Sequence, residues 1–255
     1  MEHDFTSGSV WKKLLLFAVP IFGANLLQAL YGTVDLFVVG LFADASAVSA
    51  VSTGSMTMQT ITGIITGLTM GCTVLLGQNI GKKDEAAAER TVGSALWLFV
   101  TVGILLAVIV AVLAVGIASV INALAEAFSQ TTDYIRICGI GIICIVMFNA
   151  IGGMFRGLGD ARTPLALMGV ACVVNIAGDF ALVGALKMGV AGAALATVAV
   201  QGILSTFLVR IPVSYAMSKV SGVTLFQIGF ATPLATVFGL ILSASCAVSY
   251  THLTL

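Results

Sequence analysis

Long apolar segments constrain this chain more than any other feature of its sequence. Each is at or above the roughly 20 residues that an α-helix needs to cross a bilayer. The seven segments lie at about 14–42, 51–76, 92–120, 132–155, 164–186, from near 188 onward, and 223–248. Only 9% of the 255 residues are charged, whereas soluble domains carry about 25%. The sequence therefore predicts an all-α membrane protein, a polytopic helical bundle with about seven transmembrane helices.

The composition also argues against several classes of protein. Eleven basic residues balance eleven acidic ones, so net charge gives no reason to expect nucleic-acid binding. The 5 cysteines lie singly in apolar segments and the 2 histidines lie in the tails, so neither disulfides nor a metal site is expected. The sequence contains no HExxH and no GxSxG motif, and we expect no enzymatic activity.

Basic residues predict how the helices are oriented in the membrane. They cluster in alternate loops, at 12–13, 82–90 and 156–162, while the intervening loops are acidic or nearly uncharged. The positive-inside rule then places the N-terminus in the cytoplasm. We expect a multi-pass protein of the plasma membrane. No cleavable signal peptide is expected, because the first apolar segment is too long for one.

Polar side chains inside the predicted spans are the candidates for function. An ionised carboxylate in hydrocarbon costs roughly 2.5–3.5 kcal/mol even on a lenient scale, so a chain keeps one where it faces a cavity or a partner. At 1.5 Å per residue, Asp35, Asp179 and Thr197 all lie roughly 10–14 Å below the outer interface. Asn175 lies one helical turn before Asp179 on the same face. These side chains can share one site, or they can merely hold the helices together.

Glycine and proline predict closely packed helices that can bend. Pro20 removes a backbone hydrogen bond inside the first span and is expected to kink it before Asp35. The kink can serve a mechanism or be passive. The spacing Gly63–Gly67–Gly71 is typical of close helix contact in membranes.

Several motifs in this chain resemble those of the multidrug and toxic compound extrusion (MATE) family of cation-coupled antiporters. They are Pro20 followed by Asp35 within LYGTVDLFVVG, then GCTVLLGQNIG, FRGLGDARTPL, and VVNIAGDFALV followed by MGVAGAALAT. They cover about residues 10–200 in the family's order. The resemblance implies a fold of twelve helices in two six-helix lobes around a central cavity. It also implies the export of organic, often cationic, compounds in exchange for Na+ or H+.

The same resemblance implies a cation site in the first lobe. Asp35, Asn175, Asp179 and Thr197 match the family's carboxylate, amide, carboxylate and hydroxyl positions. Two carboxylates with neutral oxygens suit a weakly held monovalent ion, and one of two adjacent acids can instead hold a proton. No cofactor is implied beyond Na+ or H+ as the coupling ion. The expected partners are the lipid bilayer and small organic substrates.

The loop FRGLGDARTPL has a structural interpretation. Arg156 and Arg162 anchor the cytoplasmic end of two spans, Asp160 caps a helix or pairs with a base, and Pro164 starts the fifth span. We expect this role rather than direct contact with a substrate.

The chain departs from the family after about residue 199. Residues 1–199 resemble the N-terminal lobe, 200–248 resemble the last two helices of the C-terminal lobe, and 249–255 resemble no native end. This pattern predicts an internally deleted chain. The orientation of the last span is in conflict, since Arg210 and Lys219 favour a cytoplasmic junction whereas the resemblance favours the reverse.

The leading hypothesis is a cation-coupled multidrug efflux antiporter, incomplete in this chain. One rival is a non-transporting half-transporter or helical scaffold, in which the acids have no ligand. Another is a lipid-linked sugar flippase of related architecture, which would place several basic residues in its cavity. The sequence leaves open whether two copies of the chain pair.

Overall fold

A computed structural model of the protein describes residues 10–202, and all of its regular elements in that range are helices. They are α1 (Val10–Phe42), α2 (Ala45–Gly81), α3 (Glu85–Val120), α4 (Phe128–Ile140), α5 (Ile142–Gly157), α6 (Arg162–Asp179), the π-helix η1 (Phe180–Ala185) and a last helix, Gly189–Gly202. Four spans are long and apolar enough to cross a membrane, and α4 with α5 makes a fifth if the pair is counted as one. The predicted polytopic helical membrane fold is confirmed. The predicted seventh span and the 249–255 tail lie outside the described residues.

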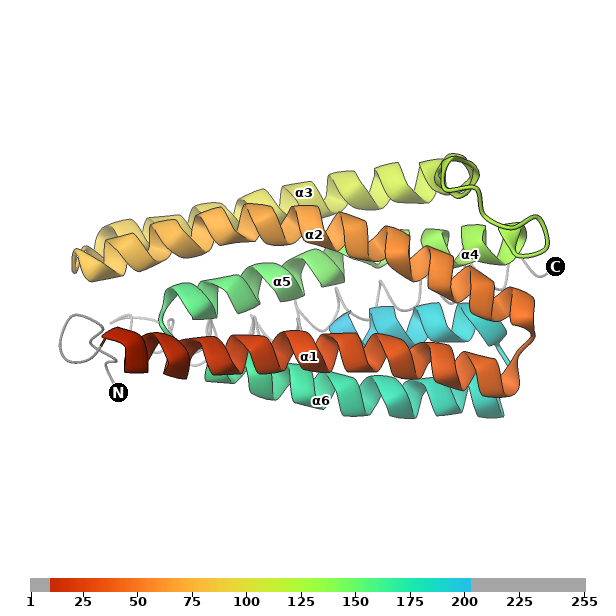
Figure 1. Cartoon of the computed structure of the whole chain (residues 1–255). Coiled ribbons are helices and arrows are strands. Elements are labelled where there is room, and N and C mark those ends of the chain that lie inside the picture. The colour runs from red at the N-terminus through yellow and green to blue at the C-terminus, as the bar shows by residue number, and fades with distance from the viewer. Residues whose placement is uncertain (1–9, 203–255) are drawn as a thin grey trace, which may run out of the picture.

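The helices form two groups (Figure 1). In one group α1 packs along α6 and η1; in the other, α2 and α3 pack against α4 and α5. A short turn joins α1 to α2, and the two helices diverge toward their other ends (Figure 1). This divergence places the candidate site between the two groups.

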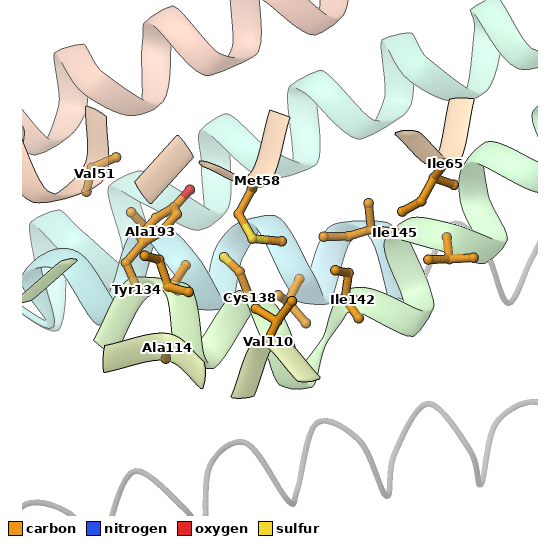
Figure 2. Packing of buried hydrophobic residues seen from close by; sticks show 14 of the residues in the cluster. Val51, Met58, Ile65, Val110, Ala114, Tyr134, Cys138, Ile142, Ile145 and Ala193 are labelled. Atoms are coloured by element: carbon orange, nitrogen blue, oxygen red, sulfur yellow. The ribbon is translucent and has the colours of Figure 1, made fainter. Parts of the chain in front are cut away.

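The apolar core lies between α2, α3 and the α4–α5 pair, with the last helix beside it (Figure 2). Val51, Met58 and Ile65 of α2 are spaced seven residues apart, so one face of that helix points into the core. The outward faces are also apolar; Trp97 and Val112 of α3 are 76% and 73% exposed. Apolar residues both inside and outside are typical of helices that face lipid.

The start of α3 lies within DEAAAER, directly after the turn that follows α2. Asp84 precedes the helix, and one of its carboxylate oxygens accepts a hydrogen bond from the backbone N–H of Ala87 at 2.9 Å. Asn79 near the end of α2 donates to the hydroxyl of Thr91 in α3 at 2.9 Å. These bonds hold the α2–α3 turn together.

The span predicted over 132–155 is helical but broken. The chain instead forms α4 and α5, which bend by 54° at Gly141. A Cβ at Gly141 would lie 2.2 Å from Cγ1 of Val198, and one at Gly139 would lie 2.7 Å from Cγ1 of Val110. The missing side chains allow two helices to approach this region closely. A glycine inside an apolar segment does not reveal such contacts, which is why the break was not predicted.

The fifth span also differs in detail from the prediction over 164–186. It runs as an α-helix only to Asp179 and continues as the π-helix η1. π-Helices are rare, and they occur mostly as single wide turns next to α-helical segments, frequently at functional sites. The chain turns between η1 and the last helix, with positive φ at Lys187 (53°) and Gly189 (55°). Pro20 lies inside an uninterrupted α1, and its kink stays a prediction.

Candidate ion site and polar cavity

A cavity of about 390 Å³ lies between α1, α2, α4, α5, α6 and the last helix. Its polar lining consists mainly of neutral amides and hydroxyls. The amides come from Asn25, Gln28, Gln59, Asn149, Asn175 and Gln201, and the hydroxyls from Tyr31, Ser55, Thr62, Thr66, Tyr134 and Thr197. Among the described residues that line the cavity, Asp35 is the sole Asp, Glu, Lys, Arg or His. The cavity is therefore polar, and its one formal charge is negative.

Asp35 is on the inward face of α1 and is only 4% exposed. The neighbouring Val38 and Val39 are fully buried, so packing holds this face of the helix against the bundle. The Thr197 hydroxyl of the last helix donates to Oδ2 of Asp35 at 3.4 Å. The other carboxylate oxygen of Asp35 is buried and has no hydrogen-bond partner among the described residues.

Asp179 and Asn175 lie one turn apart on α6, and both are buried. Packing of α6 along α1 brings the carboxyl group of Asp179 into contact with that of Asp35. Two ionised carboxylates are both acceptors, so this contact becomes a hydrogen bond only when one of them carries a proton. Within the described part of the chain, neither oxygen of Asp179 and neither amide atom of Asn175 has another partner.

The structure places Asp35, Asp179 and Thr197 beside one another, at the common depth expected from the sequence. Asn175 lines the same cavity, while Asp179 is fully buried beside Asp35 and outside the cavity lining. These four residues offer carboxylate, amide and hydroxyl oxygens, which are the ligands of hard cations. No cluster of three or more His, Cys, Asp or Glu occurs in residues 10–202. The donor set fits Na+ or a proton, and their binding stays a prediction.

Two hydrogen bonds across the cavity were not predicted. Gln201 donates to the hydroxyl of Tyr31 at 3.5 Å, and the hydroxyls of Ser55 and Tyr134 lie 3.1 Å apart. They link α1 to the last helix and α2 to α4. Uncharged polar residues isolated in apolar spans are a signal for such hydrogen bonds. The predictions were based mainly on charged residues inside the spans, so these bonds were not among them.

Asp160 caps the start of α6 rather than forming an ion pair with a basic side chain of the described residues. Its Oδ1 accepts hydrogen bonds from the backbone N–H groups of Arg162 and Thr163, each at 3.0 Å, and the Thr163 hydroxyl donates to Oδ2. Burial acts to raise the pKa of Asp160, but these hydrogen bonds and the charge of Arg162 together hold that pKa below its usual value. The structural interpretation of this loop is thus confirmed for Asp160.

The chain is thus a multi-pass helical membrane bundle with two buried acids beside a polar cavity. The MatE family model matches residues 20–181, which is more than half of the chain. The chain belongs to the MatE family. The resemblance found in the sequence motifs is confirmed.

Curated relatives of the chain are named for multidrug resistance. The probable multidrug resistance protein YoeA of Bacillus subtilis is 31% identical over 205 residues, which cover 79% of this chain and 44% of YoeA. The probable multidrug resistance protein NorM of Thermotoga maritima is 28% identical over 73% of this chain and 41% of its own length. The chain therefore spans less than half the length of these relatives.

Solved structures confirm the fold. A multidrug resistance MATE family transporter of the MOP superfamily, in an outward-facing conformation, matches with a TM-score of 0.75 and 24% identity, over 94% of this chain and 53% of that one. A MOP superfamily transporter from Pyrococcus furiosus matches with a TM-score of 0.77 and 23% identity, over the same shares. At these identities the likeness shows the fold alone.

Proposed function

We propose that residues 1–199 form one lobe of a cation-coupled multidrug efflux antiporter, with Asp35, Asn175, Asp179 and Thr197 as the site of the coupling ion. The observation that carries the proposal is the contact of the Asp35 and Asp179 carboxyl groups inside the bundle, with the Thr197 hydroxyl on Asp35. Two negative charges in contact within a membrane repel each other strongly unless a cation lies with them. Either Na+ or a proton removes that repulsion, so both are candidates for the coupling ion.

The cavity supplies the link between the ion and a substrate. Asp35 lines it and carries its one formal charge, while Tyr31, Met58, Tyr134 and Phe148 give it aromatic and apolar surface. An organic cation entering the cavity is attracted by the ionised Asp35 and can stack on the aromatic rings. A coupling ion at Asp35 cancels that charge, so the binding of one weakens the binding of the other. This competition is what exchange requires.

The rival functions fit less well. A flippase for an anionic lipid-linked sugar is expected to place basic residues in its cavity, and none of the described lining residues is Lys or Arg. A passive scaffold gives no reason for two acids in contact, three of whose four carboxylate oxygens have no donor among the described residues. The relatives' names also favour drug export. The basic loops support a cytoplasmic N-terminus in the plasma membrane.

Transport by the purified 255-residue chain in proteoliposomes tests the proposal. The probe is the fluorescent cation ethidium, and the driving force is an imposed gradient of Na+ or of pH. We expect gradient-driven ethidium flux that Asp35→Asn and Asp179→Asn abolish. The matched control is Asp44→Asn, an exposed acid in the turn between α1 and α2, which should retain the flux. Absence of gradient-driven flux in the unaltered chain would support the passive scaffold instead.

A further inference from the structure

A second pocket lies at the end of the bundle opposite the basic loops, where the α1–α2 turn, the start of α4 and the turn after η1 meet (Figure 1). This outer pocket has a volume of about 380 Å³. Its lining contains two carboxylates, Asp44 and Asp133, and one ammonium group, Lys187. All three side chains are exposed. The outer pocket is therefore open to water, and its formal charge is negative.

Two polar groups of the outer pocket lack the partners expected of them. Asp44 directly precedes α2, where a carboxylate commonly caps the helix, but its side chain makes no capping hydrogen bond. The side-chain carbonyl oxygen of Gln130 is buried and accepts no hydrogen bond from the described residues. Carboxylate and amide carbonyl oxygens are ligands of hard cations. The outer pocket therefore favours the arrival of small cations.

Two helices lead from the outer pocket to the pair of buried acids. Ala43 lines the pocket directly after α1, and its N–H donates to the carbonyl of Val39 at 2.9 Å, so the helical spacing from Asp35 continues through Val39 to Ala43. On the other side Val183 of η1 lines the pocket, four residues after Asp179. Residues four apart lie about one turn apart on one side of a helix, and α1 packs along both α6 and η1. A single layer of valine side chains therefore separates the outer pocket from the acids.

This valine layer is closed in the structure. Val39 is 0% exposed and Val183 is 1% exposed, so little or no water reaches either side chain. An apolar constriction stops ions by excluding water until it widens. Because π- and α-helical turns hold different numbers of residues, a change of η1 to an α-helix would rotate Val183 relative to Asp179. The fold thus contains a means of opening the layer.

We propose that the outer pocket is the entry through which the coupling cation reaches Asp35 and Asp179 from outside, with Val39 and Val183 as its gate. This inference rests on the proposed function of the acids as the ion site. The polar cavity is the other approach, but its lining includes Asp35 and not Asp179, and an organic cation bound there covers Asp35. An ion that enters through the outer pocket reaches the acids from behind a bound substrate. It can therefore displace that substrate without first competing for the cavity.

Charged adducts in the outer pocket test this route. In a chain whose native cysteines are replaced by serine, Ala43→Cys is reacted before reconstitution with a methanethiosulfonate that attaches either a trimethylammonium group or a sulfonate. Gradient-driven ethidium flux is then measured while the concentration of Na+ or of protons is varied. We expect the cationic adduct to raise the ion concentration for half-maximal flux by roughly tenfold, and the anionic adduct to raise it far less. Maximal flux should be retained, and a reducing agent that removes the adduct should reverse the shift.

The matched control is Thr62→Cys on α2, because Thr62 lines the polar cavity and is half-buried like Ala43. Its cationic adduct should instead raise the ethidium concentration for half-maximal flux. Each cysteine variant is its own control for folding, since its flux is measured before the adduct forms.

Three outcomes would overturn the inference, and they are distinguishable. If the adduct at Ala43→Cys has no effect on a protein that transports, the outer route is wrong and the ion site stands. If the adduct at Thr62→Cys causes the larger shift in ion concentration, the ion enters through the polar cavity. If the unmodified chain shows no flux driven by Na+ or protons, the proposed function fails together with this inference.

Discussion

Replacing Gly153 with alanine tests how closely α2 and α5 are packed. The new Cβ would lie 2.1 Å from Cγ2 of Thr69 and 3.0 Å from the hydroxyl of Thr73. Thr69 cannot rotate away freely, because its hydroxyl donates to the carbonyl of Ile65 at 2.8 Å. Thr73 donates to the carbonyl of Gly153 itself at 2.9 Å, which fixes the spacing of the two backbones.

The expected loss of stability follows from two opposing effects. Overpacking of this kind costs about 1–3 kcal/mol, while alanine gains about 0.5–1 kcal/mol over glycine in a helix. We therefore expect the free energy of unfolding to fall by roughly 1–2 kcal/mol. The assay is unfolding in mixed micelles of increasing dodecyl sulfate content, followed by circular dichroism.

Two further variants test whether the contact with Thr69 causes the loss of stability in Gly153→Ala. Gly116→Ala has no atom within 4 Å of its Cβ position, so it should be neutral or stabilising. Thr69→Ser removes Cγ2 but keeps the hydroxyl, and combined with Gly153→Ala it should restore most of the lost stability. The reasoning is refuted if Gly153→Ala is as stable as Gly116→Ala, or if Thr69→Ser gives no recovery.

Three other predictions can be checked by the same unfolding assay. Gly141→Ala should be destabilising because its Cβ would lie 2.2 Å from Cγ1 of Val198, and Val198→Ala should recover only part of the loss, since the Cβ of residue 198 would still lie 2.9 Å away. Asp160→Ala should cost about 0.5–2 kcal/mol near pH 7 through loss of the α6 cap. The pKa of Asp160 in the folded state is held below 3.8. The difference in unfolding free energy between Asp160→Ala and the unaltered protein should therefore narrow as the pH falls below 3.8. Tyr134→Phe should cost about 0.6 kcal/mol by removing the bond to Ser55, and an unchanged free energy of unfolding would argue against that bond.

The sequence predicts the position of the candidate ion site because simple lengths determine it. Apolar segments define the spans, and the rise per residue then gives each polar group a depth. Asp35, Asp179 and Thr197 come from three different helices, yet their common depth in the membrane was enough to predict that they lie close together. Residue identity and counting therefore predicted most of the candidate site.

The bends and the remaining polar contacts could not be predicted in this way. The break lies at Gly141, where a Cβ would collide with Val198, a residue far along the chain. The π-helix after Asp179 and the hydrogen bond between Gln201 and Tyr31 likewise depend on which helix faces happen to meet. Hydropathy gives the length of a helix but not the direction of its faces, so these features required the structure.

The most direct test of the ion site is the apparent melting temperature of the purified protein between pH 5 and 8, with and without Na+. A ligand that binds the folded state raises its stability by mass action, by about 2.7 kcal/mol at a hundred times its dissociation constant. We expect a response to Na+ or to pH that Asp44→Asn retains and Asp179→Asn loses; if Na+ is the ion, its effect should grow as protons become scarcer. A melting temperature indifferent to both ions, or an unchanged response in Asp179→Asn, would contradict the assignment of Asp35, Asn175, Asp179 and Thr197 as one ion site.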